Sequence, residues 1–234
     1  MNSKHTAKAF EADLASLKES LLLMGGIVES MLKEAFDAFT GVSPDLAKMI
    51  IERDDDVDRV EKSVDELAIQ ILALRQPAAR DLRFVSTALK ISKDLERMGD
   101  EIVNICERLV ELTEMGEDEE FNKIDQTHLK ALFQMAQEVM TRALDAFVSL
   151  SSQEAGEILS LDEKIDRKYR ELYQEYVSMI ETNPRLTRRI LKILFIAKYL
   201  ERIADHATNF AEQVIFVVEG LDIRHEENIL PTPS

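Results

Sequence analysis

The stretch Leu95-Glu96-Arg97-Met98-Gly99-Asp100 decides the fold, because it returns 105 positions later as Leu200-Glu201-Arg202-Ile203-Ala204-Asp205. The match extends further along the chain, where Asn104 falls on Asn209 at the same offset. Agreement of this length between two parts of one chain indicates an internal duplication. The sequence therefore predicts two copies of one structural unit.

A second match lies upstream of the first. Residues 35–39 (AFDAF) align with residues 143–147 (ALDAF) at an offset of 108. With no gap, the same offset carries two aspartates of the first copy onto two of the second, Asp54 and Asp58 onto Asp162 and Asp166. A unit of this length is too long for the common solenoid repeats, so we expect two separate helical bundles rather than an open array.

The composition predicts an all-α chain. Only 7 Gly and 5 Pro interrupt 234 residues that are rich in helix-forming types. Ser43 and Pro44 read as an N-cap followed by the first helical residue, and they separate the first two helices. Three helices are expected in each repeat, at residues 5–39, 44–75 and 78–112, and again at 126–149, 153–182 and 185–219. The predicted fold is a tandem repeat of two three-helix bundles.

Four segments follow from this pattern. Residues 1–113 form the first repeat and residues 124–220 the second. Between them, residues 114–123 are strongly acidic, and we expect a solvated linker rather than a helix there. Residues 221–234 are polar and broken by proline, so we expect a flexible tail.

Charge and cysteine content exclude several classes of protein. The net charge of −16 argues against nucleic acid as a partner. The single cysteine, Cys106, cannot form an intramolecular disulfide, and the first residues lack the apolar core of a secretion signal. No apolar stretch is long enough to span a bilayer. We therefore expect a cytoplasmic protein.

The duplicated polar residues are the candidate site. Asp54 and Asp58 lie one turn apart on one helix face, as do Glu96 and Asp100 on the next helix. If these two helices run side by side, four carboxylates converge in a groove near the surface. Their repulsion would be relieved by a hard cation with oxygen ligands. The predicted metal ligands are Asp54, Asp58, Glu96 and Asp100 in the first repeat, and Asp162, Asp166, Glu201 and Asp205 in the second.

A simpler interpretation is that these acids form solvated helix faces, which is the usual fate of a carboxylate pair four residues apart. The duplication argues against it, since the same four positions are acidic twice. Neighbouring acids behave differently: Glu61 and Asp65 become Tyr169 and Tyr173, as expected of positions that are free to vary. Two nearby arginines, Arg97 and Arg202, either hold one of the candidate ligand carboxylates in place or form surface ion pairs with Asp94, Glu101 or Glu201, and the ion pairs are the favoured interpretation.

Two motifs, Gln76-Pro77-Ala78-Ala79-Arg80-Asp81-Leu82-Arg83 and the repeated Leu-Glu-Arg-x-x-Asp, closely resemble those of the PhoU family. The resemblance covers nearly the whole chain. In the second repeat, Asn183-Pro184 and the residues after it only loosely match the first of these motifs, and Ala204 replaces Gly99.

The resemblance implies two symmetrical three-helix bundles with multinuclear iron clusters, or other metals such as zinc, manganese or magnesium, at the acidic pairs. It also implies a homodimer and a cytoplasmic negative regulator of the phosphate response. Such a protein limits uptake through the phosphate ABC transporter and restrains the phosphate sensor histidine kinase. Composition and spacing alone support only a helical, acidic, metal-capable chain with amphipathic faces for partner helices.

Two other classes of protein also present carboxylates on helices. A carboxylate-bridged di-iron enzyme would need Glu-x-x-His motifs, and the sequence contains none. Nucleotide-binding and nucleophile motifs are also missing, so we expect a protein that is not an enzyme. The alternative that stays open is a metal-free helical adaptor, in which the predicted ligand carboxylates are simply solvated. Gly25 and Gly26 within the first helix are interpreted as structural.

Overall fold

The computed structural model describes residues 2–223, and every regular element in that range is helical. The elements are α1 (Asn2–Gly41), α2 (Pro44–Glu52), α3 (Asp54–Arg75), α4 (Ala79–Glu114), α5 (Glu119–Asn122), α6 (Thr127–Ser149), α7 (Ser152–Thr182), η1 (Pro184–Leu186) and α8 (Thr187–Glu219). The all-α prediction is confirmed, and the predicted helices all form, with some differences at their boundaries. Of the predicted tail, everything beyond Ile223 lies outside the described residues.

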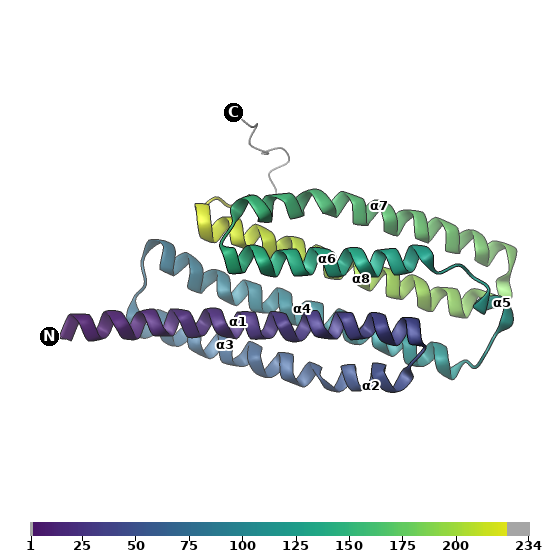
Figure 1. The fold of residues 1–234 in the computed structure, drawn as a ribbon, viewed down its shortest axis with the longest axis horizontal. Coiled ribbons are helices and arrows are strands. Elements are labelled where there is room, and N and C mark those ends of the chain that lie inside the picture. The colour runs from purple at the N-terminus through teal and green to yellow at the C-terminus, as the bar shows by residue number, and fades with distance from the viewer. Residues whose placement is uncertain (1, 224–234) are drawn as a thin grey trace, which may run out of the picture.

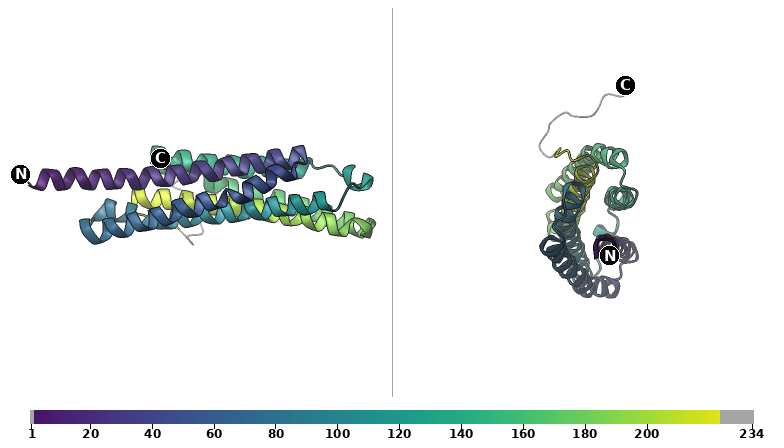
Figure 2. Two further views of the ribbon diagram at one scale, coloured as in Figure 1. Left: turned by 90° about the horizontal axis from the view of Figure 1, so that it is seen from below. Right: turned by 90° about the vertical axis from the view of Figure 1, so that its left-hand side faces the viewer.

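The helices form two layers. Four of them, α3, α4, α8 and α7, lie side by side as a curved layer, and α1 and α6 cover one face of it (Figure 1, Figure 2). At the centre, α4 and α8 run antiparallel, since Glu101 pairs with Arg202 while Glu111 pairs with Lys192. Each repeat is thus a three-helix bundle, and the two bundles share one apolar core across the α4–α8 contact.

Both repeats turn from their first helix into their second in the same way. Val42 and Leu150 adopt left-handed backbone angles, with φ of 49° and 51°. The next residue in each case is a serine whose hydroxyl caps the following helix, Ser43 accepting from Leu46 N at 3.4 Å and Ser151 from Glu154 N at 3.2 Å. The predicted serine cap is confirmed. A β-branched residue at positive φ is unusual and strained.

The predicted second helix is broken at Arg53 into α2 and α3. Backbone bonds run from Arg53 N to Ile50 O and from Asp56 N to Arg53 O, so the chain turns tightly there without a proline or glycine. The break makes Asp54 the first residue of α3, with three acids in the first turn. Negative charge at a helix N-terminus is favourable, which helps to explain the new start. In the second repeat, α7 runs unbroken through Asp162.

The acidic linker is also more ordered than predicted, because one turn of helix, α5, forms inside it. Asp118 caps this turn by accepting from Glu120 N and Phe121 N, and the Phe121 side chain is buried. Arg189 of α8 reaches across and donates to the carbonyls of Met115 and Gly116 at 2.9 and 2.7 Å. The expectation of a non-helical, solvated segment overlooked this buried anchor.

The two glycines in α1, Gly25 and Gly26, have different roles. A Cβ at Gly25 would overlap the Leu144 side chain of α6, whereas one at Gly26 would meet nothing within 4 Å. Gly25 therefore permits the close approach of α1 and α6. Among the described residues, no helix is both long and apolar enough to cross a membrane.

Candidate metal centres

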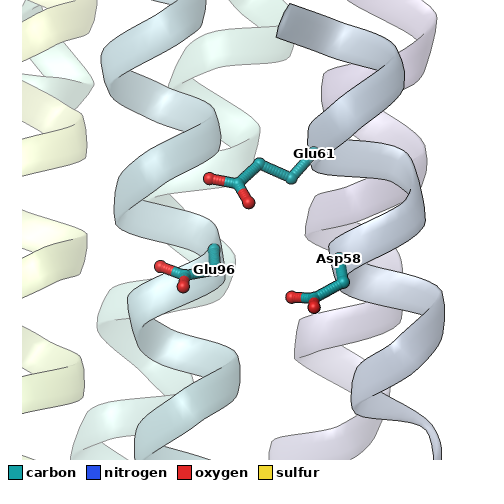
Figure 3. A group of neighbouring side chains, drawn as sticks. All are labelled: Asp58, Glu61 and Glu96. Carbon is teal, nitrogen blue, oxygen red and sulfur yellow. The ribbon is translucent and has the colours of Figure 1, made fainter.

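The duplicated carboxylates lie where neighbouring helices of the outer layer run side by side. The first cluster (Asp54, Asp58, Glu96, Asp100) lies between α3 and α4, and the second cluster (Asp162, Asp166, Glu201, Asp205) lies between α7 and α8. In Figure 3, Asp58 and Glu96 project into the space between α3 and α4, with α1 behind them. The first cluster is therefore on the face of the layer that α1 leaves open.

Three carboxylates in each repeat come close enough to share one ion. Oxygens of Asp58, Glu61 and Glu96 all lie within 4.8 Å of one another, and so do oxygens of Asp166, Glu201 and Asp205. Neither group of three contains Asp54, Asp100 or Asp162, and these lie at the margins of the clusters. The structure thus places every predicted ligand in or beside a convergent group.

Glu61 was not among the predicted ligands. It lies one turn beyond Asp58 on the same face of α3, and its carboxylate points toward Glu96 (Figure 3). Its counterpart in the second repeat is Tyr169, so Glu61 was not included among the predicted ligands. The i, i+3 spacing from Asp58 was the available signal, but the comparison between repeats overrode it. The two clusters consequently differ by one carboxylate.

Burial and mutual repulsion raise the pKa of several cluster carboxyls. Burial, followed by the charges of Asp100, Asp58 and Glu96, raises the pKa of Asp54 to about 6. In the second cluster, burial and the charges of Glu201 and Asp162 raise the pKa of Asp205 to about 6. Carboxyls with such pKa values are destabilised as anions, and a nearby cation would remove that cost.

A small residue makes room for the first cluster. A Cβ at Gly99 would lie 3.1 Å from Oδ1 of Asp54 and 3.5 Å from the Val57 side chain. Gly99 of α4 therefore lets the start of α3 come close. At the equivalent position of α8 the residue is Ala204, which is buried.

Each cluster also contains a lysine at equivalent positions, Lys93 and Lys198. The Lys93 ammonium lies 2.8 Å from Glu96 and 3.5 Å from Glu61. Lys198 pairs with Glu201 and lies 5.4 Å from the centre of the Tyr169 ring. The hydrogen bond to Glu96, with the charge of Glu61, raises the pKa of Lys93. These tethered cations show that each cluster binds positive charge, and a metal ion would compete with them.

The nearby arginines agree with the sequence interpretation in part. Arg97 contacts two carboxylates of the first cluster: its Nη1 lies 3.4 Å from Asp100 and its Nε 3.7 Å from Glu96. Arg202 bonds Glu101 of the other repeat at 2.9 Å. Arg97 thus has the alternative role of contacting the predicted ligands, whereas Arg202 reaches a predicted partner, Glu101, across the α4–α8 contact between the repeats rather than along one helix.

The donor set fits a hard metal ion. It is composed of carboxylates that come from two packed helices, and burial together with neighbouring carboxylates raises the pKa of Asp54 in the first cluster and of Asp205 in the second. Hard divalent and trivalent cations prefer such oxygen ligands, and a shared site between two helices would also tie those helices together.

Comparison with known proteins gives one consistent family. A family model described as the PhoU domain matches residues 21–109 and 129–214. The chain is 37% identical over 221 residues to a "phosphate-specific transport system accessory protein PhoU homolog" of Pseudomonas aeruginosa, covering 94% of this chain and 90% of the relative. It is 33% identical over 229 residues to the Escherichia coli protein of the corresponding name, covering 95% and 90%.

Solved structures share this fold. The crystal structure of PhoU from Pseudomonas aeruginosa superposes with a TM-score of 0.86 at 36% identity, covering 91% of this chain and all of that one. The phosphate transport system regulatory protein PhoU from Streptococcus pneumoniae gives a TM-score of 0.81 at 26% identity, with 91% and 98% coverage. The names describe accessory and regulatory proteins, not enzymes, as the sequence analysis expected.

Proposed function

The chain belongs to the PhoU family, and on that premise we propose that it is a metal-binding, cytoplasmic negative regulator of phosphate uptake and phosphate-responsive signalling. It acts through contacts with the phosphate ABC transporter and with the phosphate sensor histidine kinase. The relatives named above are accessory proteins of phosphate transport, and the match covers both repeats. The observation that carries the metal-dependent part is the duplication of a convergent carboxylate cluster.

The first cluster would hold metal through Asp54, Asp58, Glu96 and Asp100, and the second through Asp162, Asp166, Glu201 and Asp205. Iron in multinuclear clusters is the proposed occupant, with zinc, manganese or magnesium as the alternatives. Bound metal would supply positive charge and a bridge between helices. Four carboxylates in each cluster allow bridging between several ions, which is why a multinuclear site is favoured.

The charged residues of the first cluster would couple metal binding to the spacing of α3 and α4. Without a metal ion, Asp54 of α3 repels Glu96 and Asp100 of α4, and this repulsion acts between the two helices. Lys93 offsets part of it by pairing with Glu96 and Glu61. A bound cation would displace the lysine and draw the two helices together. Because α4 packs against α8, a change at one cluster reaches the other repeat through the centre of the layer.

The proposal is tested in a strain that lacks the chain. Phosphate uptake in phosphate-rich medium should rise several-fold on deletion and return to normal with the native chain. A variant carrying Glu96→Ala, Asp100→Ala, Glu201→Ala and Asp205→Ala should accumulate to the native level but fail to restore control. A control variant loses four exposed acids instead (Glu52, Glu66, Glu107 and Glu181, each to Ala) and should restore it.

The metal-free adaptor makes the opposite prediction, since the cluster variant would then restore control as well as the native chain does. Unchanged uptake on deletion would contradict the proposed regulation of transport altogether. The homodimer is a separate part of the proposal, and the sedimentation coefficient of the purified chain tests it directly.

A further inference from the structure

The two clusters differ at one position beside the predicted ligands. Glu61 occupies this position in the first repeat, and Tyr169 is its counterpart in the second. Glu61 completes the close group of carboxylates with Asp58 and Glu96, whose oxygens lie within 4.8 Å of one another (Figure 3). The four predicted ligands and Glu61 thus give the first repeat five carboxylates, whereas the second repeat has four.

The Glu61 side chain is turned toward the ligands and away from water. It keeps only 18% of its surface exposed, close to the 15% of Glu96 on the facing helix. The Lys93 ammonium lies between the two carboxylates, 3.5 Å from Glu61 and 2.8 Å from Glu96. Half of the Lys93 side chain is exposed, so it can move out into solvent. A metal ion in its place would gain both carboxylates.

The second repeat offers less at the equivalent place. Lys198 pairs with one carboxylate, that of Glu201, and its ammonium lies 5.4 Å from the centre of the Tyr169 ring. The Tyr169 ring also packs against that of Tyr173, with the centres 6.3 Å apart. A ring face attracts the lysine, but a tyrosine at this position adds no carboxylate for a metal ion. Displacing Lys198 would therefore free one carboxylate and lose the contact with the ring.

From this difference we propose that Glu61 is a fifth metal ligand of the first cluster and makes this cluster bind divalent metal more tightly than the second. The charge of the oxygen ligands strongly affects the affinity of a site for a hard cation. One more carboxylate at contact distance corresponds to about 10- to 100-fold in the dissociation constant of a divalent ion. When metal is scarce, the first repeat fills first. The inference rests on the proposed metal binding and adds the residue that ranks the two sites.

The test measures each cluster separately in the full chain. Asp166→Asn with Glu201→Gln leaves only the first cluster intact. The equivalent pair, Asp58→Asn with Glu96→Gln, leaves only the second. Each protein is stripped with chelator and titrated with Mn²⁺, and electron paramagnetic resonance measures the free ion. We expect the intact first cluster to bind Mn²⁺ about 10- to 100-fold more tightly than the intact second cluster.

Substitutions at the position that differs identify the cause. With only the first cluster intact, Glu61→Gln removes the charge but little of the shape, and it should weaken Mn²⁺ binding about 10- to 100-fold. Glu66→Gln is the matched control, because Glu66 is an exposed acid of the same helix, and it should leave the affinity unchanged. With only the second cluster intact, Tyr169→Glu should tighten binding by a similar factor. The melting temperature without metal checks that each variant folds.

Equal affinities of the two clusters would overturn the inference, as would a Glu61→Gln protein that binds Mn²⁺ like the Glu66→Gln control. The proposed metal binding would stand in both cases. Unchanged binding on Tyr169→Glu in a folded protein would also overturn the inference, since this position would then not rank the sites. If neither the native chain nor the two single-cluster proteins bind Mn²⁺, the inference fails together with the metal-dependent part of the proposed function.

Discussion

Asp54 gives the most direct view of charge repulsion in the first cluster. Burial, followed by the charges of Asp100, Asp58, Glu96 and Asp55, raises its pKa from the usual 3.8 to about 6. Asn has nearly the same shape as Asp and carries no charge. Asp54→Asn should therefore stabilise the metal-free chain, even though it removes a proposed metal ligand.

The size of the effect follows from linkage. A pKa raised from 3.8 to 6 corresponds to about 3 kcal/mol at neutral pH. Solvent screens a half-buried group, which lowers this to about 1–2 kcal/mol. Asp54 is also the first residue of α3, and losing its favourable interaction with the helix dipole removes about 0.5 kcal/mol. A net stabilisation of about 1 kcal/mol remains.

The sign depends on pH. Because the folded state binds the proton of Asp54 more tightly than the unfolded state, its ionisation weakens the fold as pH rises from about 4 to about 6. Urea unfolding in chelator should show Asp54→Asn more stable than native at pH 7.5 and equal to it near pH 4. Asp55→Asn is the matched control, since Asp55 is exposed in the same helical turn and should give a slight loss. A loss of stability like that of the control, or a gain that does not depend on pH, would show that the charge of Asp54 does not destabilise the metal-free fold.

Three further predictions concern the scaffold, and thermal or urea unfolding measures each. Val42→Gly should stabilise the chain by about 1 kcal/mol, because it relieves a left-handed β-branched residue; a lower melting temperature would contradict this. Gly26→Ala should also stabilise, by about 0.5–1 kcal/mol, while Gly25→Ala should destabilise through its overlap with Leu144; the reverse order would disprove the assigned roles. Arg189→Met should cost about 2–3 kcal/mol and speed proteolytic cleavage of the linker, so unchanged cleavage would argue against the anchor.

The helices and the two clusters could be predicted because their signals are local. Breakers and serine caps bound the helices, and the i, i+4 spacing puts Asp54 with Asp58 and Glu96 with Asp100 on single faces. Duplication then separated these acids from ordinary surface charge. Pairing of the helices within each repeat follows from their short connections.

Contacts between the repeats could not be predicted in this way. The Arg202–Glu101 pair joins residues about 100 positions apart, and no spacing within a helix reveals it. The break at Arg53 could not be predicted because no glycine or proline marks it in the sequence. Glu61 was missed because comparison of the repeats highlights what they share, and its counterpart in the second repeat is Tyr169.

The most direct measurement of the central claim is the metal content of untagged protein by elemental mass spectrometry, before and after incubation with iron, manganese and zinc. We predict stoichiometric or multinuclear metal in the native chain and in the variant lacking Glu52, Glu66, Glu107 and Glu181. The metal should be lost, and the helical spectrum kept, when Glu96, Asp100, Glu201 and Asp205 are replaced by Ala. Metal-free native protein after all three incubations, or equal metal in both variants, would contradict this claim.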